Sequence, residues 1–411
     1  SVTNKPTLII SKSTIGKYAP NKENTSGVHG SPLGENEFEL FLENIGFSGD
    51  PFIHDSEIYS YFDEKRANDN SKFDEWKANL ESKLQSDKNF RQLWNQFNNF
   101  EISEVELEWS SDEASRVVGG KILNEYGLSN KFIIGGSADL AASTKQIISD
   151  NTFGSNNFGG NSIEFGIREH AMGGIVNGLA LHSKLIPYGS TFLVFSDYMR
   201  PSMRLASLMK ANSLFIFTHD SIYLGEDGPT HQPVEHLMSL RLIPNLDVIR
   251  PANSKELIHS YRYALEKRDN PKAIILSRQN MKFFDHDVSY KDFQTGAYEF
   301  MPGTDITLIA TGSELGLAFE ISRKLKDLSV QIISAPILNR LNDDRLKSLS
   351  LNQNIFTIEL GRAIGWDTYI QNIKKSFSID SFGESAPIDQ LVEKFNFSAE
   401  KISDEIRNLL N

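Results

Sequence analysis

The sequence of 411 residues contains no cysteine. Disulfide bonds, thiolate metal sites and cysteine nucleophiles are therefore excluded, and a reducing compartment fits, which predicts a cytoplasmic location. No apolar run approaches the roughly 20 residues that cross a bilayer. Residues 1–6 (SVTNKP) include neither an initiator methionine nor the apolar core of a signal peptide, so we expect the chain to have been cut or truncated.

Positive charge is also in deficit, with 42 Lys and Arg against 54 Asp and Glu and a formal net charge of −12. An acidic chain disfavours nucleic acid and anionic membranes as partners, and we expect neither. A local basic pocket for a phosphorylated metabolite is compatible with this balance. The length predicts two or three domains, and a hydrophobic content of 39% is normal for a globular chain.

From about residue 109 onward, short apolar segments alternate with helical ones. Helices are expected over residues 116–126 and from Glu169 to Ala180, and strands at residues 131–134, 214–217, 247–249 and 273–276. This alternation predicts an α/β fold with a parallel sheet covered by helices on both faces.

A second, smaller α/β unit is expected from Pro302, after a charged, aromatic linker at residues 285–293. Its expected strands are residues 306–310, 330–333 and 355–358. Residues 311–314 (TGSE) form the turn into its first helix, and we interpret them as a structural cap in preference to a phosphate-binding turn. Near the start of the chain, residues 7–10 (TLII) predict a short strand, and residues 56–108 predict amphipathic connecting helices without chemistry.

Polar side chains follow several strands of the first predicted sheet. The segments are residues 135–140 (GGSADL), 218–221 (THDS) and 277–280 (SRQN). Each segment alone could be a helix cap. Because ligands bind beyond the carboxyl ends of parallel strands, several such segments in one sheet favour a binding site.

The densest polar segment is residues 225–233 (GEDGPTHQP), in which Asp227 and His231 offer acceptors and donors on flexible backbone. The alternative is a polar surface loop. A metal site is rejected here, because the segment lacks the spaced carboxylates of a metal loop.

Glu169 begins an apolar, glycine-rich helix, where it either complements the helix dipole or is a semi-buried carboxylate aimed at a ligand. Phe192, Phe195 and Tyr198 recur at every third residue, a stripe that alone indicates core packing. Pro201 is expected to open the next helix.

These segments, together with residues 168–170 (REH) and 382–387 (FGESAP), occur in an order that resembles transketolase. The resemblance extends over nearly the whole chain and is weakest between residues 55 and 110. It implies four parts: residues 1–55, the tail of an N-terminal diphosphate-binding domain; 56–108, a helical connecting segment; 109–290, a pyrimidine-binding domain; and 291–411, the transketolase C-terminal domain.

The resemblance implies thiamine diphosphate as the cofactor, with the protein orienting and tuning it. In the family, a carboxylate beside the aminopyrimidine ring protonates it toward the imino form, and Glu169 matches that carboxylate. Residues that match the family's cofactor site are Asp139, Glu169, Phe192, Phe195 and Tyr198. The aromatic trio is thereby expected to form the wall around the pyrimidine ring.

The resemblance also implies substrate and catalytic roles. Residues that match the family's substrate site are His29, Arg116, Ser143, His219, Asp227, His231 and Arg278, and the expected catalytic residues are Glu169, His219, His231 and His29. Arginine suits the terminal phosphate of a sugar because its planar fork pairs with phosphate oxygens. Residues 142–144 (AST) stand where the family usually has Pro-Ser-Asn.

The family's upstream Gly-Asp-Gly…Asn metal motif is absent from the chain. The expectation is therefore that the chain lacks most of the diphosphate-binding domain and has no metal ligand of its own. Ligands for Mg²⁺ or Ca²⁺ are then expected in the missing N-terminal domain, and the fragment alone is expected to be inactive.

The implied activity is transfer of a two-carbon ketol (glycolaldehyde) unit from a ketose phosphate to an aldose phosphate in the non-oxidative pentose phosphate pathway. The expected partners are sugar phosphates and a second copy of the chain, because family members are homodimers with sites at the subunit interface. The alternatives are the smaller chain of a split transketolase, a dihydroxyacetone synthase, and a degenerate scaffold paralogue. The last would have lost site residues that this chain retains, such as Glu169 and Arg278.

Overall fold

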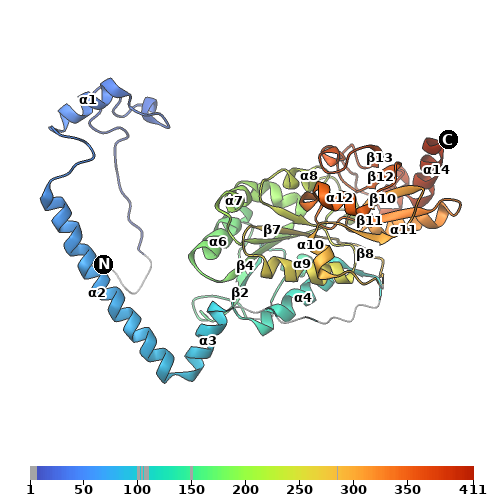
Figure 1. Cartoon of the computed structure of the whole chain (residues 1–411), viewed down its shortest axis with the longest axis horizontal. Helices are drawn as coiled ribbons and strands as arrows, with labels where there is room; N and C mark the ends of the chain where they lie inside the picture. Colours follow the sequence, from blue (N-terminus) through green and yellow to red (C-terminus); the bar gives the residue numbers. More distant parts are fainter. Residues whose placement is uncertain (1–6, 100–101, 103–104, 106–110, 149–150, 285) are drawn as a thin grey trace. The chain divides into compact units, whose positions relative to one another are not determined.

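The computed structural model describes residues 7–99, 102, 105, 111–148, 151–284 and 286–411 of the chain (Figure 1). The chain divides into two compact units, Ser1–Gln92 and Leu93–Asn411. Among the described residues, none of the helices has the length and apolar character needed to span a bilayer.

The first unit consists of loops and helices. Its helices are η1 (Ser26–Val28), α1 (Glu35–Asn44) and α2 (Ser56–Ser86), and α3 (Lys88–Asn98) follows. The Glu37 carboxylate on α1 accepts hydrogen bonds from the backbone N–H and the side-chain amide of Asn21, at 2.8 and 2.9 Å, which ties the preceding loop to the helix. Within the predicted segment 56–108, helices are confirmed as far as Asn98, and no residue of α2 is buried. Residues 100, 101, 103, 104 and 106–108 of that segment lie outside the described residues.

The strand predicted at residues 7–10 is wrong. These residues have no regular secondary structure, and Leu8, Ile9 and Ile10 are 78–86% exposed. A strand is stabilised by hydrogen bonds to a neighbouring strand. In the described part of the chain no strand pairs with this segment.

The second unit begins with a six-stranded parallel sheet in the order β3-β2-β4-β5-β7-β6. Its strands are β2 (Ile133–Ser137), β3 (Ser162–Glu164), β4 (Ile186–Phe192), β5 (Leu214–Thr218), β6 (Asp247–Ile249) and β7 (Lys272–Leu276). The connecting helices are α4 (Ser115–Ser129), α5 (Ala141–Thr144), α6 (Glu169–His182), α7 (Ser196–Met209), α8 (His236–Arg241) and α9 (Ser254–Glu266). The predicted α/β fold with a parallel sheet is confirmed.

Both faces of this sheet are covered, as the side chains of β5 show. Leu214 and Ile216 belong to the core formed with α4 and α9, whereas Phe215 and Phe217 belong to the core formed with α6 and α7. Successive side chains of a strand point to opposite faces, so a strand buried on both sides is a continuous apolar run. This explains why β5 is recognisable in the sequence.

Strand β2 passes through the two glycines that the sequence suggested as its end. A Cβ atom on Gly135 would lie 2.0 Å from the carbonyl oxygen of Tyr188, and one on Gly136 would lie 1.9 Å from that of Ile163. The neighbouring strands approach so closely that only glycine fits. The glycines are therefore part of the sheet, and the predicted end of the strand is wrong.

The second sheet has five strands in the order β13-β12-β10-β11-β9, of which β9 is antiparallel to β11. The strands are β9 (Tyr298–Met301), β10 (Ile306–Ala310), β11 (Val330–Ser334), β12 (Ile355–Ile358) and β13 (Ile373–Phe377). The helices are α11 (Glu314–Lys324), α12 (Asp343–Leu349), α13 (Ile388–Lys394) and α14 (Ala399–Leu410). The second α/β unit is confirmed, but its expected start at Pro302 is wrong, because β9 lies before that residue and pairs with β11.

Two local interpretations near this unit differ from the structure. The expected linker ends in helix α10 (Tyr290–Gln294), and Phe293 is completely buried in the core of the first sheet. In the predicted cap, Ser313 precedes α11 without making a side-chain capping hydrogen bond. The neighbouring Thr311 and Glu314 instead bind a buried arginine of the first sheet.

Candidate active site

The predicted polar segments meet at one edge of the first sheet. Asp139 follows β2, Phe192 ends β4, His219 follows β5 and Arg278 lies two residues after β7. All these strands are parallel, so their carboxyl ends share this edge. The site is thus assembled by the sheet from residues that are far apart in the sequence.

A cavity of about 510 Å³ opens at this edge. Its lining residues are Ala138, Asp139, Leu140, Ile167, Glu169, Phe195 and Tyr198. Glu169 is the first residue of α6 and is only 8% exposed. Within the described ranges no side chain forms a hydrogen bond with its carboxylate. A buried carboxylate without a partner is costly, so this group is available to a ligand in the cavity.

The aromatic trio forms one wall of the site, but not as a stripe on one helix. Phe192 ends β4, Phe195 lies in the 3-10 turn η2 (Leu193–Phe195), and Tyr198 lies in α7. The ring centroids of Phe192 and Phe195 are 5.7 Å apart, and those of Phe195 and Tyr198 are 6.1 Å apart. The interval of three arises from a strand, a turn and a helix in succession.

Helix α7 begins earlier than expected, at Ser196, so Pro201 lies inside the helix and does not open it. The turn η2 runs directly into α7 and provides its start. The proline removes one helical hydrogen bond beyond the first turn, and the predicted role of Pro201 is wrong.

His219 is held in an unusual backbone conformation beside this wall. Its φ is +62°, its ring stacks on Phe192 with centroids 3.7 Å apart, and its Nδ1 lies 2.8 Å from the hydroxyl of Thr218. Burial, aided by neighbouring positive charge, lowers the pKa of His219 to about 3. The imidazole is therefore neutral at physiological pH.

The positive charge comes mainly from two arginines that meet beside His219. The Arg116 guanidinium donates to the backbone carbonyl of Arg278 at 3.4 Å and to the carbonyl of Ser143. Burial, and then the charge of Arg278, lowers the pKa of Arg116. No described Asp or Glu forms an ion pair with either guanidinium, so the two are free to bind an anion such as phosphate.

The segment 225–233 is a loop that forms hydrogen bonds with residues 384 and 385 of the C-terminal region. Gln232 Nε2 donates to the carbonyls of Gly225 and Glu384, both at 2.9 Å, and the Ser385 hydroxyl donates to the carbonyl of Glu226. The 382–387 segment therefore holds the 225–233 loop in place, a role that was not predicted from its sequence.

The loop places His231 next to the aromatic wall. Its ring centroid lies 5.6 Å from that of Phe195, and its Nδ1 lies 3.0 Å from the Thr230 hydroxyl. Asp227 is exposed on the same loop.

The structure therefore brings together most of the predicted site residues. His29 is the exception, because it lies in the first unit as the exposed residue after η1, and no geometry links it to the others. Sequence reasoning gave no individual role to Thr218, which contacts the His219 ring, or to the apolar lining residue Ile167. A polar residue directly before the strand-end histidine was the available signal for Thr218.

One group of described residues has the composition of a metal site. Ligand atoms of Asp197, Glu235 and His236 all lie within 4.8 Å of one another. The Nε2 of His236 is already 3.2 Å from the Asp197 carboxylate, a distance that a hydrogen bond explains. We assign no ion to this group.

Comparison with known proteins gives consecutive matches along the chain. Residues 1–99 match the family model of the transketolase thiamine diphosphate binding domain, residues 114–283 that of the transketolase pyrimidine binding domain, and residues 296–398 that of the transketolase-like C-terminal domain. The transketolases of Staphylococcus aureus (strain MRSA252) and Bacillus subtilis (strain 168) are 38% and 37% identical to the chain. These alignments cover 98% and 99% of the chain, which spans 64% of the length of each relative.

Solved structures agree. A transketolase from Leishmania mexicana matches 96% of the chain and 61% of its own length, with a TM-score of 0.89 and 30% identity. The Pichia stipitis transketolase in complex with sedoheptulose 7-phosphate matches 99% of the chain and 63% of its own length, with a TM-score of 0.92 and 28% identity. A split-gene transketolase, described as an inactive β4 tetramer, matches 72% of the chain and 98% of its own length, with a TM-score of 0.60 and 26% identity.

The α/β fold and the carboxylate-lined cavity define a pyrimidine-binding module of the thiamine-diphosphate-dependent kind. The chain belongs to the transketolase family.

The matches also correct one expectation. Residues 1–99 match the thiamine diphosphate binding domain of the family, so the expectation that the chain lacks most of this domain is wrong. The matched region runs through α1, α2 and α3. The linked expectation that ligands for Mg²⁺ or Ca²⁺ lie in a missing domain is not borne out, for the same reason.

Proposed function

We propose that this chain acts as a transketolase, which transfers a two-carbon ketol unit from a ketose phosphate to an aldose phosphate in the non-oxidative pentose phosphate pathway. The observation that carries the proposal is the Glu169 carboxylate, nearly buried in an apolar cavity beside Phe195 and Tyr198. Thiamine diphosphate supplies the carbanion chemistry when it is bound.

The residues of the cavity fit the aminopyrimidine end of that cofactor. Aromatic side chains bury a flat ring and stack on it, and Phe192, Phe195 and Tyr198 offer such a wall. Glu169 offers a carboxylate that would share a proton with a ring nitrogen, and its burial would strengthen that interaction. Asp139 lines the same cavity. The expected metal, Mg²⁺ or Ca²⁺, is part of the proposal because the diphosphate of the cofactor needs a counter-charge.

The arginine pair supports a phosphorylated substrate. Arg116 and Arg278 present their charges beside His219, and Ser143 lies next to Arg116. The neutral His219 can donate or accept a hydrogen bond at a sugar hydroxyl, and His231 and Asp227 offer further groups on the loop. His29, in the first unit, is proposed as a further substrate-binding and catalytic residue.

The phosphate role predicts a selective defect. Arg278→Gln in the holoenzyme should raise the KM for a ketose phosphate about tenfold to a hundredfold, because a charge-assisted hydrogen bond contributes about 1.5–3 kcal/mol. The KM for an unphosphorylated ketose should change little. Steady-state kinetics with both donors measures the effect, and Arg323→Gln on the exposed side of α11 is the control. Equal loss for both donors would contradict the assignment.

A homodimer is proposed because the packed helices α6 and α7 expose several large apolar side chains. Asn177 on α6 donates to the carbonyl of Ser202 on α7 at 2.8 Å, so the two helices are packed together. The apolar side chains that they and the preceding loop expose, at 44–78%, are Ile167, Ile175, Leu181, Tyr198, Leu205, Leu208 and Met209. Large exposed apolar patches are typical of subunit interfaces. Tyr198 also lines the cavity, which places the site at the proposed interface.

Charge on this face should disrupt the dimer. The double variant Leu205→Asp, Leu208→Asp should raise the dimer dissociation constant at least a hundredfold, because central apolar contacts each contribute about 2 kcal/mol. Sedimentation velocity over a dilution series measures the change. Leu128→Asp, on the C-terminal part of α4, is a matched control with a 61% exposed leucine. Unchanged sedimentation of the double variant would exclude this face as the interface.

A further inference from the structure

Arg250 is a buried arginine that joins the six-stranded and the five-stranded sheet of the second unit. It follows β6, it is 0% exposed, and its backbone N–H donates to the Pro336 carbonyl at 2.8 Å. Its own carbonyl accepts from the Gly312 N–H at 3.1 Å, in the turn before α11. Arg250 therefore follows a strand of the six-stranded sheet, while its backbone hydrogen bonds are made to loops of the five-stranded sheet.

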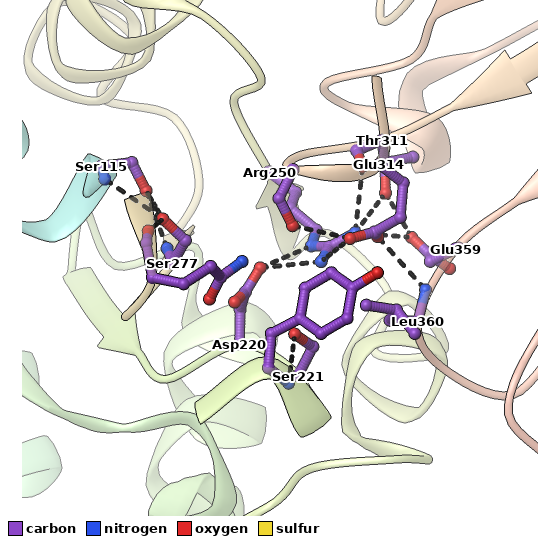
Figure 2. A network of polar contacts seen from close by, with 12 residues as sticks. Ser115, Asp220, Ser221, Arg250, Ser277, Thr311, Glu314, Glu359 and Leu360 are labelled. Carbon is purple, nitrogen blue, oxygen red and sulfur yellow. Dashed lines mark hydrogen bonds and ion pairs between the residues drawn. The ribbon is translucent and has the colours of Figure 1, made fainter. Parts of the chain in front are cut away.

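Figure 2 shows the Arg250 guanidinium between carboxylates from the two sheets. On one side, Nη2 and Nε donate to Asp220 Oδ2 at 2.7 and 3.2 Å. On the other side, Nη2 donates to Glu314 Oε1 at 3.2 Å, and Nη1 donates to Glu314 Oε2 and, at 3.0 Å, to Thr311 Oγ1. All three side chains are at most 2% exposed, so these interactions act without screening by water.

Residues in two loops next to the five-stranded sheet fix the position of the Glu314 carboxylate. The Leu360 N–H donates to Glu314 Oε2 at 3.2 Å, and the Ser313 hydroxyl donates to Oε1 at 2.6 Å. Thr311 donates to Glu359 at 2.5 Å, and Glu359 in turn pairs with Arg241 at 2.7 and 2.8 Å. The Arg250 side chain therefore has one defined position.

The active-site side of this network ends at His219. Asp220 is the next residue in the chain, and its Oδ1 is buried without a partner in the described structure. Arg250 is thus the anchor of the Asp220 side chain. A left-handed backbone conformation, such as the +62° φ of His219, costs roughly 1–2 kcal/mol and persists only where the surroundings hold it.

We propose that Arg250 and Glu314 are positioning residues for the active site, acting through Asp220 to hold His219 in its strained conformation against Phe192. The proposal rests on the proposed function and adds a role for the C-terminal α/β unit: its first helix contributes a carboxylate that fixes an active-site histidine. The unit then contacts the site in two places, through this chain of contacts and through the hydrogen bonds of Glu384 and Ser385 to the 225–233 loop.

The test combines Glu314→Gln with His219→Asn in the holoenzyme. Glu314→Gln should lower kcat/KM for a ketose phosphate about tenfold to a hundredfold, since a small misplacement of a site group has effects of this size. In the His219→Asn background the same substitution should have almost no further effect, because the group it positions is already gone. A merely structural role would give the same loss in both backgrounds.

Two further measurements keep the test decisive. In the cofactor-free protein labelled with ¹⁵N-histidine, Glu314→Gln should shift the ring signals that His219→Asn removes. Asp247→Asn is the control, since Asp247 is buried and pairs with Arg340 at 2.8 Å, and no hydrogen bond joins its side chain to Arg250 in the described structure. It should lower the melting temperature without changing kcat/KM more than about twofold, a threshold within the error of additivity. If Glu314→Gln does not fold, Thr311→Val removes one acceptor of Arg250 at nearly constant volume.

The outcomes separate the two proposals. If the unaltered enzyme does not turn over a ketose phosphate, the proposed function fails. If it is active and Glu314→Gln keeps its kcat/KM, or loses it equally with and without His219, the positioning role is wrong while the function stands.

Discussion

Glu169→Gln in the holoenzyme is expected to lower the turnover of a ketose phosphate at least a hundredfold, the size typical of acid–base groups. Glutamine has nearly the same shape and keeps one acceptor, so the cavity and the start of α6 should be preserved. What is lost is the negative charge and the ability to share a proton with a ring nitrogen. Steady-state kinetics gives the turnover, and titration followed by circular dichroism gives the affinity for thiamine diphosphate.

Glu125→Gln provides the control, because Glu125 is an exposed glutamate on α4, on the other face of the sheet. Its kinetics and cofactor affinity should match those of the unaltered enzyme. If Glu169→Gln retained more than a tenth of the activity, the carboxylate would not have the proposed role. The cavity would then have to bind a different ligand, and the proposed enzymology would fail with it.

Glu359→Gln is expected to lower the free energy of unfolding by about 3 kcal/mol at pH 7, because it leaves Arg241 buried without its counter-charge. Arg241 is 1% exposed in its side chain and donates two hydrogen bonds to Glu359. The Nε1 of Trp366 donates to the same carboxylate at 3.1 Å, so tryptophan fluorescence in urea is a suitable probe.

The effect should depend on pH in a defined direction. Burial alone would raise the pKa of Glu359, but Arg241 and Arg250 outweigh it and the pKa is lowered to about 2, against 4.5 ordinarily. A carboxyl group with a lowered folded pKa stabilises the fold above its unfolded value and loses this contribution as pH falls. The difference between the two proteins should be constant above about pH 4.5 and shrink between 4.5 and 2.

Glu266→Gln is the control for this prediction. Glu266 accepts a hydrogen bond from Arg262 at 2.7 Å, but both side chains are about 30% exposed. A pair in contact with water contributes about 0.3–0.5 kcal/mol on a helix. Loss of similar free energy in both variants would show that burial does not decide the strength of the Glu359 pair.

The parallel sheet illustrates what local patterns can and cannot predict. Strand β5 was predictable because it is buried on both faces and is therefore apolar at successive positions. Strand β4 lies beside β5 and is just as buried, yet Pro187 and Gly189 interrupt its pattern. Proline is tolerated within this strand, and glycine fits because Met172 of α6 would lie 2.9 Å from a Cβ atom. The local sequence does not show that Pro187 and Gly189 lie within a buried strand.

Some features of the candidate site were likewise predictable from the sequence, and others were not. Segments after strands β2, β5 and β7 could be expected to meet, because parallel strands end at the same edge. The aromatic trio was visible only as an interval of three, and the structure builds it from three kinds of element. That Phe195 and Tyr198 line the cavity followed from the resemblance to transketolase and from the fold, and not from the interval.

The sequence by itself determined the α/β class, the presence of the two larger sheets of the second unit and the set of polar segments from which the site is built. Those features depend on hydrophobic period and chain direction, which are local. Only the tertiary structure decided that Asp220, Arg250 and Glu314 share one buried ion-pair network. The three residues are 30 and 64 positions apart, and the pairing of buried charges depends on which segments exclude water together, a property that no local pattern carries.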